Sequence, residues 1–308
     1  MINHVGLLRP VTLAHWVTRV CTFLASGRAL PARSPRLGIS CGERSVALVE
    51  LEPRRRGMNV ACAGVEPRRR GERSARPALE RLLERLSPRA RRVVTALDAD
   101  RLLEQRIELP AGLSPCEVER HLHARLSRLA ATLDEPPVFD FSLIDDIDFR
   151  TGVPQRLSWR LVACRPSELE ARLGEFAGLG LKIAAVDVDL FALSRLVERT
   201  PADALLYRDG HRLWLVRDGF RLALDLAGVD PGQALVDWLP SVWGDAPPVR
   251  LWLAGDGWAS SDPNGLSGAL GRRVAPYESR VIGTRPGRGD GGDARLALAY
   301  ALAVRGCR

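Results

Sequence analysis

The chain has 308 residues, 46% of them hydrophobic and 27% charged, so it is long enough to form more than one lobe around a buried core. Its net charge of +8 comes almost wholly from arginine, since Lys182 is the only lysine, and the acidic residues are interspersed with the arginines. This mixed pattern argues against nucleic-acid binding. Six cysteines lie mostly in apolar runs without a Cys-x-x-Cys pair, which argues against disulfides and metal sites.

Residues 1–34 form a basic segment, and no acidic residue precedes Glu43. Apolar residues such as Trp16, Val20 and Phe23 recur at helical spacing, but the stretch is too short and too interrupted to span a bilayer. Three interpretations stay open: an amphipathic segment at a membrane surface, a helix that docks on the body or on a partner, and non-native residues upstream of the true start.

The folded body is predicted to open with an antiparallel meander of strands at 37–41, 45–51 and 58–65, with a tight turn at Gly42. Two copies of Glu-Pro-Arg-Arg-Arg-Gly, at 52–57 and 66–71, flank the third strand. They could bind phosphate, but we expect them to be solvated turns at the same end of a sheet. An amphipathic helix from Pro77 and a buried strand at 93–97 follow.

The middle of the chain is predicted to hold a helix that starts at Pro115, with Ser114 as its N-cap and Glu117 reaching back, and then a strand at 138–143. The right-handed crossover rule places the strands at 93–97 and 183–188 in one sheet, and a linking helix starts at Asp189. Further on, Asp209-Gly210 favours a hairpin turn between strands at 203–208 and 211–216.

Several of these segments also carry motifs of a known family. They are the strand 93–97 followed by residues 105–110, the helix opening at 117–119, Phe139-Asp140-Phe141, residues 161–165, 177–179 and 186–193, and the terminal run 299–306. In order and spacing, this set resembles the PilM family of type IV pilus assembly proteins, which are actin-like relatives of FtsA.

The resemblance implies an α/β chain with a two-lobed actin-like (ribonuclease H-like) ATPase fold and an α+β subdomain inserted in lobe one. Its expected parts are the N-terminal segment 1–34, lobe one at 35–113, the inserted subdomain at 114–186, a linking helix at 187–199, and a shortened lobe two at 200–308. Lobe two is expected to be short because only about two dozen residues separate Leu226 from the strand at 249–253, where the family has a helical subdomain.

In such folds the first hairpin cradles ATP phosphates through an Asp-x-Gly pattern followed by Ser or Thr. The matching residues here are Ser40, Cys41, Gly42 and Glu43, so the acid is absent, and the adenosine-side glycine pair is represented by Gly255 and Gly257. We interpret these positions as a degenerate nucleotide cleft that binds Mg-ATP weakly, if at all, with no catalytic residue and no metal site. The alternative is an active ATPase with an atypical site.

The resemblance also implies a partner, the cytoplasmic tail of a PilN-like inner-membrane protein, with an Asn-Leu-Leu-Pro core and a nearby Arg. Asp140, Asp145 and Asp146 are the candidate carboxylates for that Arg. The equally weighted alternative is that Asp140 is a solvent-side strand residue and the acids keep the turn soluble. The chain is thus expected to be a cytoplasmic scaffold held at the inner membrane by its partners; a further hypothesis is an unrelated binding role on an inherited fold.

Overall fold

The computed structural model describes residues 36–54, 57–129, 135–144, 155–197, 202–217, 220–227, 230–243, 246–258, 262–277 and 294–305. The segment 1–34, Asp145 and Asp146 lie outside these residues. The described chain forms two compact units: residues 100–171 are one, and the flanking residues 36–99 and 172–305 together are the other. No helix in the described part is long and apolar enough to cross a membrane.

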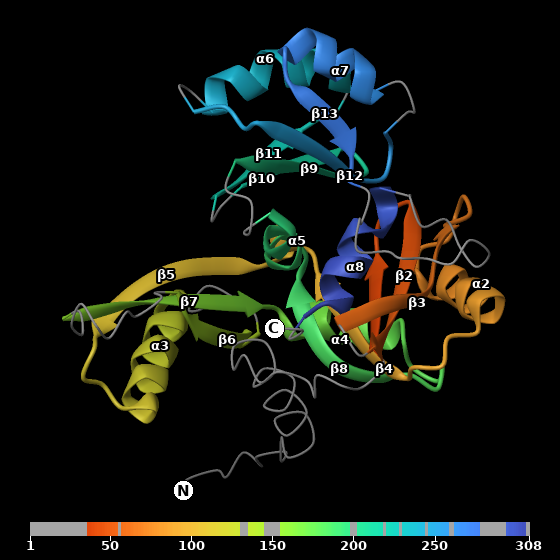
Figure 1. The fold of residues 1–308 in the computed structure, drawn as a ribbon. Coiled ribbons are helices and arrows are strands. Elements are labelled where there is room, and N and C mark those ends of the chain that lie inside the picture. Colours follow the sequence, from red (N-terminus) through yellow and green to blue (C-terminus); the bar gives the residue numbers. More distant parts are fainter. Residues whose placement is uncertain are drawn as a thin grey trace, which may run out of the picture. The chain divides into compact units, whose positions relative to one another are not determined.

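The larger unit contains two five-stranded sheets with the same arrangement (Figure 1). In each sheet, the first three strands in the sequence form an antiparallel meander, and the next two strands add in parallel beside the first strand. Across the sheet, the strands therefore lie in the order third, second, first, fourth and fifth in the sequence. The first sheet consists of β1 (Arg36–Cys41), β2 (Ser45–Arg54), β3 (Gly57–Pro67), β4 (Arg92–Leu97) and β8 (Lys182–Val188). The second consists of β9 (Asp203–Asp209), β10 (Arg212–Arg217), β11 (Phe220–Asp225), β12 (Arg250–Gly255) and β13 (Arg273–Pro276).

Helices pack on both faces of the first sheet. Buried Leu79 and Leu82 of α2 (Arg76–Leu86) join one core cluster with Leu37 and Val93. The C-terminal helix α8 (Ala297–Ala303), preceded by the 3-10 turn η3 (Ala294–Leu296), packs on the other face. This helix lies so close to β1 that a Cβ at Gly38 would be 1.9 Å from the Ala299 carbonyl oxygen, so only glycine fits there.

The second sheet has its own apolar core. Leu206, Leu213 and Leu253 of the strands pack with Leu235 of α6 (Pro231–Trp243) and Leu266 of α7 (Asp262–Leu270). Helix α5 (Asp189–Val197) connects β8 to β9 and contacts strands of both sheets. Alternation of apolar residues on the strands therefore places helices against both sheets of the larger unit.

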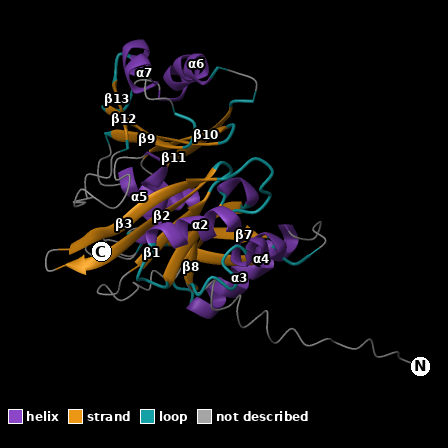
Figure 2. Cartoon of the chain, turned by 90° about the vertical axis from the view of Figure 1, so that its right-hand side faces the viewer, coloured by secondary structure: helices purple, strands orange, loops and turns teal. Residues whose placement is uncertain are grey.

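The smaller unit is a three-stranded antiparallel sheet of order β5-β7-β6 with a helix on one face (Figure 1). Figure 2 shows this helix beside β7 from another side. Its elements are η1 (Ala99–Arg101), β5 (Leu103–Pro110), α3 (Pro115–Leu129), β6 (Val138–Leu143), β7 (Arg156–Cys164) and the start of α4 (Pro166–Gly174). Apolar residues of the strands and of α3, such as Leu122 and Leu161, form its core. The predicted start of α3 is confirmed, since the Ser114 N–H donates to the Glu117 carboxylate over 2.8 Å.

The α/β class, the first meander, the β9–β10 hairpin and the parallel β4–β8 pair are as predicted. Strand β11, which completes the second meander, was not predicted, and the boundaries differ. The inserted unit begins near residue 100 rather than 114, because β5 pairs with β7, and it ends near 171 rather than 186, because β8 pairs with β4. The range 200–308 is not a single lobe, since α8 packs on the first sheet. The two Glu-Pro-Arg-Arg-Arg-Gly copies lie at opposite ends of β3, because Arg54 pairs with Gly57 and Ser45 pairs with Pro67.

Candidate functional site

The predicted phosphate hairpin is the turn between β1 and β2, and it meets the turn at the end of β9. Gly42 closes the first turn by donating its N–H to the Ser45 carbonyl over 2.9 Å. The N–H of Glu43 donates to the carboxylate of Asp209, at 3.0 Å from one oxygen and 3.4 Å from the other. An amide that could hold a phosphate oxygen is therefore occupied by a carboxylate of the chain itself.

The predicted adenosine-side glycines follow β12 and approach the same turn. Gly255 and Gly257 both have a φ of +86°, a left-handed conformation that glycine adopts without strain. Between them, the Asp256 carboxylate accepts a buried hydrogen bond of 2.7 Å from the Ser45 hydroxyl. Four of the five predicted cleft positions, Gly42, Glu43, Gly255 and Gly257, therefore lie at or next to two contacts, Glu43–Asp209 and Ser45–Asp256.

The fifth position, Ser40, is the penultimate residue of β1 and is buried. It occupies the place where the resemblance expects an aspartate. We find no described hydrogen bond that directs its hydroxyl toward Asp209 or Asp256. Ser40 is therefore part of the hairpin but contributes no carboxylate to it.

Four carboxylates that the sequence reasoning did not assign to the site lie where strands end. Asp98 follows β4, Asp189 follows β8, Asp209 ends β9, and Asp256 follows β12. Carboxyl ends of parallel strands are where α/β sheets place their ligand sites. The sequence signal that could have indicated these residues is an aspartate that directly follows, or follows by one residue, the apolar run of each strand.

Burial and the charges of neighbouring carboxylates raise the pKa of two of these groups, Asp189 and Asp209. Burial, with a smaller contribution from the charge of Asp98, raises the pKa of Asp189 to about 8. The hydrogen bonds that this carboxylate accepts from the N–H groups of Leu190 and Ala99 lower the pKa, but by less. Burial likewise raises the pKa of Asp209 to about 6, opposed by the Glu43 N–H and reinforced by Asp98 and Asp256. At neutral pH, Asp189 is therefore mostly uncharged.

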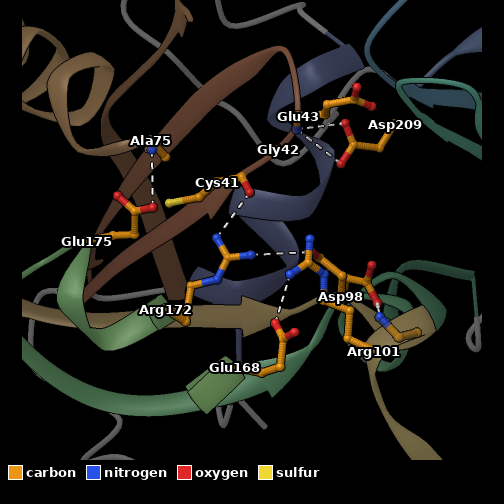
Figure 3. Close-up of polar contacts among 12 residues, drawn as sticks. Cys41, Gly42, Glu43, Ala75, Asp98, Arg101, Glu168, Arg172, Glu175 and Asp209 are labelled. Carbon is orange, nitrogen blue, oxygen red and sulfur yellow. Dashed lines mark hydrogen bonds and ion pairs between the residues drawn. The ribbon is translucent and has the colours of Figure 1, made fainter. Parts of the chain in front are cut away.

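One arginine enters this cluster from the helix that follows the smaller unit (Figure 3). Arg172 of α4, whose side chain is 12% exposed, donates to the Cys41 carbonyl oxygen over 3.1 Å and to Asp98 over 3.2 Å. Its charge partly neutralises Asp98, and it fixes the end of β1 just before the turn. Burial raises the pKa of the Cys41 thiol, so this cysteine is an inert neighbour rather than a nucleophile.

The described residues contain no group of three or more His, Cys, Asp or Glu side chains placed to hold a metal ion. The strand-end carboxylates are close enough to raise one another's pKa, but the described ones are not grouped so that three of them could coordinate one metal ion.

The predicted partner residues belong to the smaller unit. Asp140 is buried in β6, and its carboxylate accepts the N–H of Phe141 over 2.8 Å, so the alternative of a solvent-side strand residue is wrong. Asp145 and Asp146 lie outside the described residues, so their grouping with Asp140 stays a prediction. His123 of α3 stacks edge-on against the neighbouring Phe139 ring, which gives this histidine a packing role.

Comparison with known proteins agrees with this architecture. A family model described as type IV pilus assembly protein PilM matches residues 38–210. A chain of the solved PilM–PilN type IV pilus biogenesis complex aligns with a TM-score of 0.63 at 20% identity, over 90% of this chain and 99% of that one. That likeness shows the two-lobed actin-like fold expected from the sequence.

Two other solved structures align with lower TM-scores. The cytoplasmic domain of EpsL, an inner-membrane component of the type II secretion system of Vibrio cholerae, gives 0.48 at 15% identity over 89% of this chain and 94% of that one. A Bacteroides thetaiotaomicron protein with an actin-like ATPase fold gives 0.47 at 9% identity, over 89% and 96%.

Proposed function

Because the chain belongs to the PilM family of type IV pilus assembly proteins, we propose that it is a scaffold of a type IV pilus, or of a related type II secretion-like, assembly machine. On this proposal it binds the cytoplasmic tail of a PilN-like inner-membrane protein, and that partner holds it at the cytoplasmic face of the membrane. The shared fold with a chain of the PilM–PilN complex supports a partner of this kind.

The observation that favours a scaffold over an ATPase is the contact between the two turns. The Glu43 N–H already donates to Asp209, and the Ser45 hydroxyl donates to Asp256, so a triphosphate would have to displace both carboxylates. Like charges 4 Å apart repel by about 4 kcal/mol at an effective dielectric constant near 20. One uncompensated carboxylate beside a phosphate therefore lowers affinity by roughly three orders of magnitude.

The alternative, an active ATPase with an atypical site, is favoured by one observation. Asp98, Asp189, Asp209 and Asp256 stand at strand ends of both sheets, where a divalent cation and its water shell would be held in this kind of fold. A cation would need these carboxylates ionised, whereas burial holds the pKa of Asp189 near 8. The alternative therefore requires Mg-ATP to bind strongly enough to remove that proton.

One titration distinguishes the two functions. A fluorescent peptide with the sequence of the PilN-like protein's cytoplasmic tail is titrated with the chain, with and without Mg-ATP, while calorimetry measures Mg-ATP binding directly. A scaffold binds the peptide with an affinity that Mg-ATP changes less than twofold. Peptide binding that requires Mg-ATP, or micromolar Mg-ATP binding with phosphate release, would establish the ATPase instead. A chain that does not bind the peptide at all would contradict the scaffold proposal.

The peptide site is proposed to include the smaller unit around Asp140. If the peptide's Arg pairs with this buried carboxylate, the isosteric Asp140→Asn variant should lose about tenfold in peptide affinity, because a charge-assisted hydrogen bond becomes a neutral one. The matched control is Asp237→Asn on the exposed side of α6 in the other unit, which should bind as the wild type does. Unchanged affinity in Asp140→Asn, and in a variant that also replaces Asp145 and Asp146, would place the peptide site elsewhere.

A further inference from the structure

Strand β11 (Phe220–Asp225) forms one edge of the second sheet, and no other described strand pairs with its outer side (Figure 1). On its inner side it follows β10 in an unbroken register that ends where the Leu226 N–H donates to the His211 carbonyl over 2.7 Å. Backbone groups alternate in direction along an antiparallel strand. Because Leu226 bonds inward, the N–H and C=O groups of Arg221, Ala223 and Asp225 face outward.

The other edges of the two large sheets carry features that discourage further pairing. Strand β3 has a register shift on its partner and ends in Pro67, β8 begins with Lys182 and also faces a register shift, and β13 is only four residues long and ends in Pro276. Short edges, lysines, prolines and bulges are the devices that keep sheet edges from associating. Strand β11 has six residues, no lysine, no proline and no register shift, and its two charged residues, Arg221 and Asp225, are of opposite sign.

The sequence of β11 is complementary to itself in the antiparallel direction. We propose that β11 pairs with β11 of a second copy of this chain, about a two-fold axis at Ala223, to form a symmetric dimer with a continuous sheet. In this register Arg221 lies opposite Asp225 of the other copy, twice by symmetry, and Leu222 lies opposite Leu224. Opposite charges across a strand pair stabilise it, and like charges would destabilise it.

The side chains along the edge are compatible with this pairing. Ala223 at the axis is exposed among the described residues and has a small side chain, which favours the approach of a second backbone. The guanidinium of Arg221 lies over the Phe191 ring, 4.3 Å from its centroid, which orients this charge on the same face as Asp225. Arg221, Ala223 and Asp225 share that face because side chains alternate along a strand.

The charge pattern favours a second copy over an unrelated extended peptide. An unrelated strand could pair with the same backbone groups. A second copy of β11, however, necessarily places an acid opposite Arg221 and a base opposite Asp225, because its sequence is the same. Three outward-facing residues from each copy would form about six main-chain hydrogen bonds. Such a contact is at the small end of specific interfaces, so we expect dissociation constants of about 10–100 µM.

The first test is sedimentation of the full chain over a wide concentration range. Ala223→Pro removes an outward-facing N–H that the chain's own sheet does not use, and should lower dimer affinity at least tenfold while leaving the circular dichroism spectrum unchanged. Ala223→Ser keeps the N–H and should dimerise as the wild type does. A chain that stays monomeric at several hundred micromolar, or a dimer that Ala223→Pro does not weaken, would overturn the proposal.

A cross-link provides the second test and decides the case even if Ala223→Pro fails to fold. Residues opposite each other in a hydrogen-bonded antiparallel pair have Cα atoms about 5.5 Å apart, within the range that a disulfide spans. Oxidised Ala223→Cys should therefore form a covalent dimer, while Val249→Cys, which is 66% exposed elsewhere on the same unit, should remain at the wild-type level set by the native cysteines. Equal cross-linking of the two variants would refute the β11 interface.

Discussion

The Asp189→Asn substitution tests whether Asp189 is kept protonated, which is what argues against a cation held by this carboxylate. Asp189 is buried at the start of α5 and accepts hydrogen bonds from the N–H groups of Ala99 and Leu190. An asparagine has nearly the shape of the protonated acid, and its carbonyl oxygen can accept the same two bonds. The substitution therefore removes the ionisation and little else.

The magnitude follows from the pKa of Asp189. Burial and Asp98 raise it from 3.8 to about 8, a difference that corresponds to roughly 5–6 kcal/mol at 1.36 kcal/mol per pKa unit. Relaxation and water entry reduce such values in practice, so we expect about 1–3 kcal/mol. Since the folded-state pKa is raised, the acid lowers stability as the pH rises from about 4 to about 8, where the unfolded chain ionises and the folded chain does not.

Urea unfolding at several pH values, followed by the fluorescence of the seven tryptophans, measures this effect. Asp189→Asn should match the wild type near pH 4 and exceed it by about 1–3 kcal/mol at pH 8. Asp237→Asn is the control for a change in net charge and should show no such pH-dependent gain. If Asp189→Asn instead destabilises the chain most at high pH, Asp189 is an ionised, stabilising group and the argument against a cation site fails.

Three further predictions follow from the turns and the termini. Gly255→Ala should lower the free energy of unfolding by at least about 3 kcal/mol, because its Cβ would lie 2.0 Å from the Arg208 carbonyl oxygen. Gly71→Ala, with a similar φ and no atom within 4 Å, should lower it by only about 1 kcal/mol. Equal losses in thermal unfolding would contradict this steric reasoning. Asp209→Asn should increase affinity for inorganic triphosphate at pH 7.5 by about tenfold or more in calorimetry, and no increase would show that this carboxylate does not compete with phosphate. A chain that begins at Pro35 should keep its melting temperature within a few degrees, and insoluble protein would show that residues 1–34 complete the core.

Much of the fold could be predicted from local sequence because its signals are local. The period of two in the strands, the cap at Ser114 and the turn at Asp209-Gly210 each depend on a few adjacent residues, and the structure has all three elements. Domain boundaries were less accurate. A run such as 103–110 has the same pattern whichever sheet it joins, and pairing with β7 rather than with the first sheet is decided by contacts far along the chain.

The sequence by itself determined the α/β class, the first meander, the hairpin at Asp209-Gly210, the loss of the acid at Ser40 and the family resemblance, because residue identity and short spacing carry that information. Only the tertiary structure decided what replaces the missing acid. Asp209 is 166 residues from Glu43, and Asp256 is 211 residues from Ser45, so no local pattern could indicate that these carboxylates accept hydrogen bonds from the first turn. The raised pKa of Asp189 is likewise a property of burial and of neighbours distant in sequence, which exist only once both sheets have folded.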